Sequence, residues 1–332
     1  MAGEHALIFD HDRAVVTVSD DADGWRKVSV QPKHPISVQR SPCRTTYPDD
    51  LIRRILDVKG PEYLCDEIAR DQDPAYTEAN IDIGLFSYLK PADFAGKTLL
   101  DFGCGCGSST MILARKLPKT AIVGTDMLAE SLSVARARAR HYGRRDITFH
   151  ASPSGSELPP ALEPMDFIVM NAVFEHFLPE ERRRVIHLLW RKLKKGGTLF
   201  IQETPNRWSP IEFHSTGLPL LNYTWDGLAH RAATRLSRRI EDNSTWEELL
   251  RGGIRGATVR EILRCIPGKA RRLEPVLLGG KDQADLWYAM SNRRHGRSAR
   301  RMAVRMAFKL AGRISSLDFT PELALAIQKV SD

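Results

Sequence analysis

The segment TLLDFGCGCGSST, residues 98–110, constrains the fold of this chain more than any other. It begins with apolar residues typical of a buried strand, continues with three glycines at alternate positions, and ends in residues that suit a helix. A glycine-rich turn between a strand and a helix brings backbone N–H groups and the positive end of the helix close to a ligand, because glycine has no side chain to hold the ligand off. The segment therefore predicts a ligand cradle at the end of a strand.

Strand-like and helix-like stretches alternate on both sides of this turn. Five runs are strand-like: TLLDF, AIVGTD, DITFH, DFIVMN and TLFIQE. Helical patterns lie between them, such as PEERRRVIHLLWRKLKK, which ends at Gly196 and Gly197. This alternation predicts an α/β fold with a parallel sheet. The runs ARRLEPVLL (270–278) and ADLWYAM (284–290) are predicted to supply two more strands.

The remaining chain divides into segments attached to a main domain at 96–292. Residues 1–45 contain short alternating runs and predict a small N-terminal β extension, and residues 46–95 carry three helical patterns at 49–58, 61–71 and 75–90. Residues 204–253 are rich in proline, glycine and aromatic residues and predict a lid inserted into the main domain. Residues 293–332 are predicted to form a basic helical tail.

Composition indicates a globular chain of the cytoplasm. Of the 332 residues, 42% are hydrophobic, which is enough for a full core, and no run approaches the roughly 18 apolar residues of a membrane span. The N-terminus carries charges where a signal peptide needs its apolar segment. Five scattered cysteines suit reduced thiols better than disulfides, and Cys104 and Cys106 have no second ligand pair nearby, so we predict no metal site.

The basic charge is concentrated in one segment. No acidic residue lies between Asp285 and Asp318, and the eight arginines and lysines there equal the whole net charge of +8. The rest of the chain is balanced. A general nucleic-acid-binding surface is therefore not expected, whereas a basic C-terminal segment is.

Two aspartates indicate which ligand the cradle takes. Asp101 lies two residues before the first glycine, where a carboxylate would repel a dinucleotide diphosphate but attract a cation. S-adenosylmethionine carries an ammonium and a sulfonium. Asp126 ends the second strand and can accept hydrogen bonds from both ribose hydroxyls of any nucleoside cofactor.

Five stretches together resemble class I S-adenosylmethionine-dependent methyltransferases, in the branch that acts mostly on small molecules. They are LLDFGCGCG, the strand end at Asp126, DFIVMNAVFEHF, LKKGG and FIQETP, within residues 80–291. The resemblance implies a Rossmann-like seven-stranded sheet whose last strand is antiparallel, with the cofactor across the carboxyl ends of the strands.

The resemblance also implies cofactor-binding residues. The glycine turn would contact the methionine portion, Asp126 the ribose, Met127 the adenine, and Asn171 the cofactor at the end of the fourth strand. The turn residues in this set are Asp101, Gly103, Cys104 and Gly105. The family often has an acidic residue after the third strand for the adenine amino group, but this chain has His150, Ala151 and Ser152 there.

Transfer of a methyl group from a sulfonium requires alignment and a dry site, and a hydroxyl acceptor also benefits from a base. Histidine can take a proton near neutral pH, and His214 in the lid and His176 after the fourth strand are the candidates; His176 also suits a packing role. Four lid aromatics suit either stacking on a substrate ring or, preferably, a small core within the lid: Trp208, Phe213, Tyr223 and Trp225.

The acceptor stays open between several classes. Residues 171–174 read Asn-Ala-Val-Phe, not the Asn-Pro-Pro-aromatic pattern common in nucleobase N-methylation, so we expect a hydroxyl of a small molecule or of a glycan- or lipid-linked acceptor. A cofactor-binding assembly module without turnover and an RNA methyltransferase are the alternatives.

The tail predicts an amphipathic helix at about 298–314. Arg301, Arg305 and Lys309 share one stripe, and the opposite side is apolar. We prefer docking of the apolar stripe on the domain or on a second copy in a homodimer, with the arginines facing water; peripheral contact with an anionic membrane is the second interpretation, and RNA the third.

Overall fold

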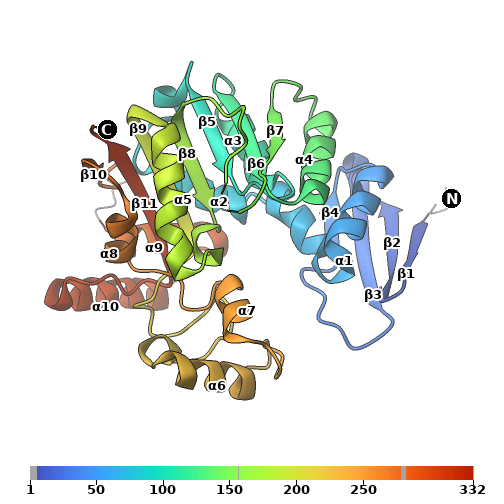
Figure 1. Ribbon diagram of the computed structural model, residues 1–332. Helices are drawn as coiled ribbons and strands as arrows, with labels where there is room; N and C mark the ends of the chain where they lie inside the picture. The colour runs from blue at the N-terminus through green and yellow to red at the C-terminus, as the bar shows by residue number, and fades with distance from the viewer. Residues whose placement is uncertain (1–5, 156, 278–281, 332) are drawn as a thin grey trace.

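The computed structural model describes residues 6–155, 157–277 and 282–331. A seven-stranded sheet forms the centre, and a separate four-stranded sheet lies beside it at the N-terminus (Figure 1). The strands of the large sheet are β5 (Thr98–Phe102), β6 (Ala121–Asp126), β7 (Thr148–Ala151), β8 (Met165–Asn171), β9 (Leu193–Pro205), β10 (Ala270–Arg272) and β11 (Glu322–Lys329).

The order of the strands is that of a doubly wound α/β sheet. It reads β10-β11-β9-β8-β5-β6-β7, so the chain starts in the middle and winds outward in both directions. Neighbours from β9 to β7 pair in parallel, and β11 alone runs antiparallel, between β9 and β10. The predicted Rossmann-like seven-stranded sheet with an antiparallel last strand is confirmed.

Helices cover both faces of this sheet. Successive strand residues point to opposite faces, and on β5 the buried Leu99 and Leu100 accordingly belong to two different hydrophobic clusters. One cluster joins the sheet to α2 (Thr77–Phe86), α3 (Ser108–Lys116) and α9 (Gln283–His295), and the other joins it to α5 (Pro179–Lys192) and α8 (Val259–Cys265). The remaining helices are α1 (Asp49–Gln72), α4 (Ala129–His141), α6 (Asp226–Leu236), α7 (Trp246–Arg251) and α10 (Ala299–Ser315).

The end of the sheet differs from the prediction. Residues 284–290 lie in α9, not in a strand, because the Asp282 side chain accepts a hydrogen bond from the backbone of Asp285 and caps a helix there. The run 270–278 contributes only the short β10, and its last residue lies outside the described residues. The missing strand is β11, inside the segment predicted as a helical tail. Neighbours cover β11 on both faces, so five consecutive apolar residues are buried and no alternation marks it as a strand.

The N-terminal extension is an antiparallel meander. Its strands pair in sequence order: β1 (Leu7–His11), β2 (Ala14–Asp20), β3 (Arg26–Pro32) and β4 (Cys43–Thr45). The first two predicted helices are the halves of α1, which bends at Gly60 (φ 74°), and Pro61 begins the second half. A third hydrophobic cluster packs this meander against α1 and α4. The extension therefore shares a core with the rest of the chain.

The inserted lid lies between β9 and α8 and contains α6 and α7 (Figure 1). Its small core consists of aliphatic residues: Leu221, Ala229, Ala233, Leu249 and Ile254. The prediction that the lid aromatics form this core is wrong. Trp225 is 72% exposed, Phe213 and Tyr223 are also exposed, and Trp208 stacks on Tyr223 with ring centroids 6.2 Å apart.

Among the described residues, the model contains no helix that is both long and apolar enough to span a bilayer.

Candidate active site

The glycine turn after β5 is held against the neighbouring strand. The backbone N–H groups of Gly103 and Cys104 both donate to the carbonyl of Thr125 in β6, at 2.8 and 2.9 Å. Gly105 has a positive φ of 52°, and a methyl group added there would meet no atom within 4 Å. The turn therefore leaves open space above Gly105, as a cradle for a ligand requires.

Two hollows meet at this turn. The first, here called the α1 hollow, measures about 430 Å³ and lies between α1 and the glycine turn. The second, the β6 hollow, measures about 670 Å³ and lies beyond the ends of β6 and β7. Both are lined by Gly103 and Ala172, so an elongated ligand that passes over these residues occupies both. The hollows lie at the carboxyl ends of the parallel strands, where ligands of such sheets bind.

Asp126 and Met127, which the resemblance assigns to the ribose and the adenine, line the β6 hollow. The two carboxylate oxygens of Asp126 accept hydrogen bonds from the backbone of Gly105 and of Leu128, each at 2.9 Å. These bonds fix the carboxylate at the rim and leave further lone pairs for a ligand. Met127 is 56% exposed, which leaves its side chain free to cover a flat ring.

Asp101 lies beneath the turn and lines neither hollow. Its carboxylate accepts hydrogen bonds from the hydroxyls of Ser109, at 2.8 Å, and Thr110, at 2.6 Å, and so holds the start of α3. Burial, and to a smaller extent the charge of Asp126, raises the pKa of Asp101 to about 6 against the effect of these bonds. Asp101 therefore supports the cradle from below.

Among the described residues, three buried side-chain oxygens at the hollows lack hydrogen-bond partners: Oγ1 of Thr125, in β6, and two that lie at or just beyond the ends of strands. The latter two are Oδ1 of Asn171, which lines the α1 hollow, and Oγ of Ser152, which lines the β6 hollow. A buried polar atom without a partner is costly, so a ligand that donates to both oxygens would stabilise the site. S-adenosylmethionine has donors at both ends, an ammonium and an adenine amino group. Ser152 belongs to the segment after the third strand, β7, in which the family often has an acidic residue.

Helix α1 adds carboxylates that the sequence reasoning did not single out. Asp66 and Glu67 line the α1 hollow, and Glu67 accepts hydrogen bonds from Arg138 and Ser108, both at 2.9 Å. Burial acts to raise the pKa of Glu67, but the charges of Arg138, Arg70 and Lys59 together with the hydrogen bond from Ser108 outweigh it, and the pKa is lowered. Glu67 is therefore ionised at neutral pH. Its negative charge suits a cationic ligand portion.

The two candidate bases lie near each other. The ring centroids of His176 and His214 are 6.2 Å apart. Nδ1 of His176 donates to the carbonyl of Arg251 at 2.7 Å, which leaves Nε2 as the basic nitrogen. Loss of surrounding water lowers the pKa of His214, and the neighbouring His176 lowers it further, so His214 is neutral near pH 7. The neutral His214 is thus able to accept a proton.

Glu175 is a third titratable group at this place. It lies in the 3-10 helix Phe174–His176, is fully buried, and has one carboxylate oxygen, Oε1, without a partner. A methyl group added at Gly253 would touch both Nε2 of His214 and Cγ of Glu175, so the three residues are neighbours. Burial raises the pKa of Glu175 to about 8, and the charges of Glu203 and Glu322 contribute. The sequence around Glu175 gives no sign of its raised pKa, because the segments that bury the side chain, β9 and the lid, are distant in the chain.

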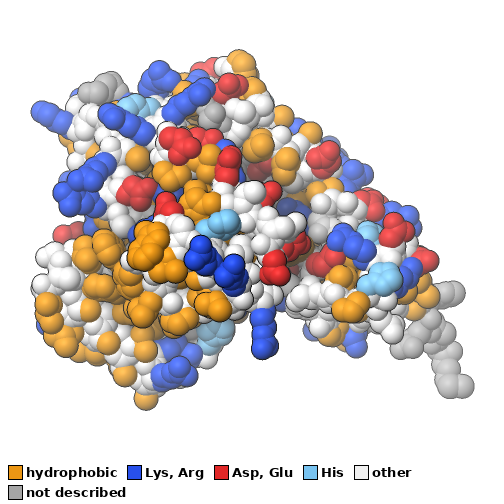
Figure 2. Space-filling model, turned by 60° about the horizontal axis from the view of Figure 1, so that its bottom comes forward, with side chains coloured by type: hydrophobic (Ala, Val, Ile, Leu, Met, Phe, Trp, Pro, Cys, Tyr) orange, Lys and Arg blue, Asp and Glu red, His pale blue; other side chains and the backbone are white. Residues whose placement is uncertain are grey.

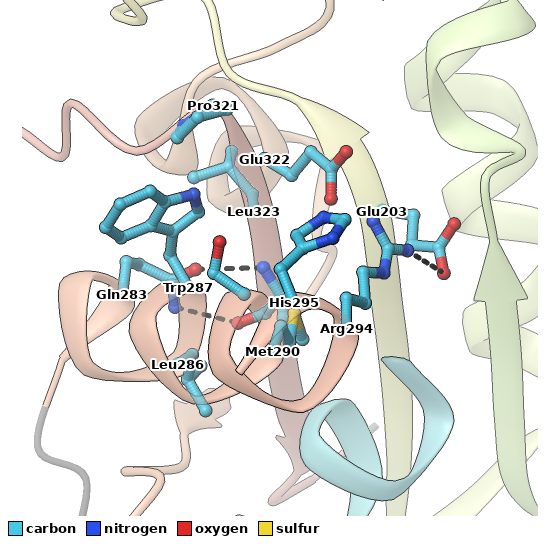
Figure 3. A pocket seen from close by; sticks show the side chains of 12 residues that line it. Glu203, Gln283, Leu286, Trp287, Met290, Arg294, His295, Pro321, Glu322 and Leu323 are labelled. Carbon is cyan, nitrogen blue, oxygen red and sulfur yellow. Dashed lines mark hydrogen bonds and ion pairs between the residues drawn. The ribbon is translucent and has the colours of Figure 1, made fainter. Parts of the chain in front are cut away.

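A small cavity of about 80 Å³ borders the two carboxylates whose charges act on Glu175 (Figure 3). Glu203, at the end of β9, and Glu322, at the start of β11, line it together with residues of α9. In Figure 3 the guanidinium of Arg294 reaches toward Glu203, at 4.0 Å, and Asn80 donates to the same carboxylate. Burial raises the pKa of Glu322 to about 7, and Glu203 adds to this. The cavity is therefore lined by two acidic side chains, Glu203 and Glu322, whose negative charge Arg294 neutralises in part.

Cys104 and Asn206 have structural contacts. Cys104 is buried and lines the α1 hollow, and the five cysteines are free thiols. Asn206 donates to the carbonyls of Asp318 and Thr320, at 2.8 and 2.9 Å, and ties the start of the lid to the segment before β11. Within the described ranges, no cluster of three or more His, Cys, Asp or Glu side chains is arranged to hold a metal ion.

Comparison with known proteins shows that part of the chain is similar to methyltransferases. Residues 99–197 match the model of a methyltransferase domain. Trans-aconitate 2-methyltransferases are similar to the chain: the protein from Afipia carboxidovorans is 32% identical over 139 residues, and the one from Azoarcus sp. is 35% identical over 116 residues. The matched segments cover 42% and 35% of this chain, and the chain spans only about half of these relatives, 51% and 42% of their lengths.

Solved structures are similar at lower identity. The YcgJ protein from Bacillus subtilis is 16% identical, with a TM-score of 0.40, over 76% of this chain and 97% of that one. A structure of an amino pentose methyltransferase from Micromonospora echinaspora with bound S-adenosylmethionine is 20% identical, with a TM-score of 0.33, over 41% of this chain and 53% of that one. The sheet order, the glycine turn and the matched residues together identify 99–197 as a class I, S-adenosylmethionine-dependent methyltransferase domain.

Proposed function

We propose that this chain binds S-adenosylmethionine across the α1 and β6 hollows and methylates a hydroxyl of a small molecule or of a glycan- or lipid-linked acceptor. The observation that carries the proposal is the junction of the two hollows at Gly103 and Ala172, with partnerless oxygens of Asn171 and Ser152 on either side. The methionine portion suits the α1 hollow with Glu67, and the nucleoside suits the β6 hollow with Asp126.

The bound cofactor would supply a sulfonium methyl group for an in-line displacement. The residues of the chain align the two reactants, and the lid excludes water from the reacting atoms. As the acceptor oxygen gains the methyl group it loses its proton, and Nε2 of the neutral His214 takes that proton in this proposal. His176, 6.2 Å away, holds the Arg251 carbonyl and so orients the lid.

Two substitutions test the role of His214. His214→Ala is expected to lower turnover by about 10² to 10⁴ and to leave the affinity for the demethylated cofactor nearly unchanged, because only proton transfer is lost. The matched control is His34→Ala, in the exposed part of the N-terminal extension. Activity is measured as transfer of labelled methyl to the components of a cell extract, including RNA, with mass spectrometry of the product. Normal turnover in His214→Ala removes its role as the base.

A carboxylate acceptor is the second candidate. The similar trans-aconitate 2-methyltransferases bear the name of a carboxylic acid, and a carboxylate needs no base because it is already ionised at neutral pH. A methyl ester product, together with normal turnover of His214→Ala, would favour this candidate. Cofactor binding without any labelled product would instead favour a module that binds the cofactor for assembly.

A further inference from the structure

Helix α10 is attached to the domain by its basic stripe. The guanidinium of Arg305 lies 2.6 Å from the Asp285 carboxylate in α9, and Nζ of Lys309 lies 2.8 Å from the same carboxylate and 3.2 Å from that of Asp282. The ring of Phe308 packs edge-on against Trp287, with centroids 5.2 Å apart. Docking of the apolar stripe on the domain, with Arg305 and Lys309 in water, is therefore contradicted, whereas docking of the stripe on a second copy stays a prediction.

The apolar stripe of α10 faces away from the domain. Its large residues are exposed in increasing degree toward the end of the helix: Met302 40%, Met306 55%, Leu310 61% and Ile314 79%. None of the seventeen residues of α10, all of which are described, is buried. A helix of this length is marginal on its own in water, and an exposed row of large apolar side chains marks a contact surface.

The lid adds apolar residues on the same side of the molecule. In Figure 1, α10 and α6 both lie at the bottom, and Figure 2, which brings this side forward, shows hydrophobic side chains gathered there with Lys and Arg side chains around them. Trp225 and Leu236, at the two ends of α6, are 72% and 69% exposed. Exposed apolar side chains on this side of the molecule therefore belong to the lid as well as to α10.

The charges beside the stripe indicate what covers it. Arg300 and Arg313 are exposed at opposite ends of α10, and within the described part of the chain neither has an ion-pair partner. No acidic residue lies between Asp285 and Asp318. Two copies packed through this face would therefore bring arginines together without a counter-charge, whereas an anionic surface would neutralise them.

We propose that α10 lies in the plane of an anionic lipid surface. The row from Met302 to Ile314 enters the boundary between headgroups and acyl chains, and Arg300 and Arg313 contact lipid phosphates at its margins. The ion pairs to Asp285 hold the helix in this orientation, so the protein presents the stripe without rearrangement. The proposal is independent of the identity of the methyl acceptor.

Flotation of the full chain with vesicles at near-physiological salt tests the proposal. We expect binding to phosphatidylcholine vesicles that contain phosphatidylglycerol, and far weaker binding to phosphatidylcholine alone. Leu310→Asp should lower the partition coefficient about tenfold to a hundredfold, because one large apolar side chain no longer enters the lipid. Neutralising Arg300 and Arg313 with glutamine should lower it by about fivefold for each residue.

A matched control distinguishes the surface from general hydrophobicity. Ile8 in β1 is also 61% exposed, and Ile8→Asp should leave vesicle binding unchanged. Circular dichroism of each variant checks that it is folded, which is expected because the substituted side chains face outward. Flotation that is absent, equal on both vesicle types, or equal in wild type and Leu310→Asp overturns the proposal. Sedimentation that shows a dimer disrupted by Leu310→Asp, without vesicle binding, overturns it in favour of a second copy.

Discussion

At Gly105 the open space beside Cα permits a test that separates ligand binding from backbone strain. Gly105→Ala places a methyl group in the cradle and forces alanine to a φ of 52°. Gly96→Ala is the control, since Gly96 also has a positive φ, 72°, and open space around it, but lies far from the hollows. Both variants should lose about 1–2 kcal/mol of unfolding free energy.

Of these two variants, only Gly105→Ala should lose affinity for the demethylated cofactor, as measured by calorimetry. Equal affinity in the Gly105 and Gly96 variants would show that the ligand does not pass over the turn.

Asp126 combines a structural and a binding role in one carboxylate. Asp126→Ala removes a charged acceptor for ribose hydroxyls and also the bonds to Gly105 and Leu128. Hydrogen bonds to a charged group contribute about 1.5–3 kcal/mol, so the cofactor affinity should fall about tenfold to a hundredfold. Asp146→Ala, which also loses two hydrogen bonds but at the surface, is the control. Calorimetry with wild-type affinity for Asp126→Ala would contradict the assignment.

Among the elements, the ends of β8, β9 and β11 bring together the carboxylates of Glu175, Glu203 and Glu322. This arrangement predicts that the unfolding free energy depends on pH. Glu175, just beyond β8, keeps its proton in the folded state up to about pH 8, whereas an unfolded glutamate loses it near about 4.3. Between these values the folded state binds more protons, so the unfolding free energy contributed by Glu175 falls as the pH rises.

Glu175→Gln stays neutral and should remove this slope. Urea unfolding between about pH 5.5 and 8.5 should show a variant that gains stability relative to wild type toward the alkaline end. The remaining slope would come from Glu322, which keeps its raised pKa. The exposed Glu180, replaced by glutamine, should retain the wild-type slope. Parallel curves for all three proteins would mean that Glu175 is ionised in the folded state.

Across the whole molecule, Arg138 joins the N-terminal segments to the ligand site. This fully buried side chain of α4 donates to the carboxylate and the backbone carbonyl of Glu67 in α1, at 2.9 and 2.7 Å, and to the carbonyl of Cys106 at 3.0 Å. Arg138→Met should lower the unfolding free energy by about 3–5 kcal/mol, because Glu67 is left buried without its partner.

The same variant should weaken cofactor binding, since Glu67 lines the α1 hollow. Arg136→Met, on the exposed side of α4, should change both quantities little. Chemical denaturation and calorimetry on the two variants measure the effects. A stable Arg138→Met protein with normal affinity would show that α1 is positioned by packing alone.

The sequence by itself determined those features that depend on contacts near in the chain. The glycine turn, Asp126 at the end of β6 and the alternation from β5 to β9 follow from local backbone preference and apolar periodicity, and they were enough to predict the sheet and the cradle. The helical patterns at 49–58 and 61–71 likewise predicted the two halves of α1, although not that they form one bent helix.

Only the tertiary structure decided which residues far apart in sequence share one environment. The strand β11 carries no alternation because neighbours cover both its faces. The pKa of Glu175 is raised by its burial first, and then by the charges of Glu203 and Glu322. The pattern of α10 showed two faces but not which one turns inward. Asp285, on another helix, decided that by pairing with Arg305 and Lys309, since an ion pair depends on distance in space and not on separation in sequence.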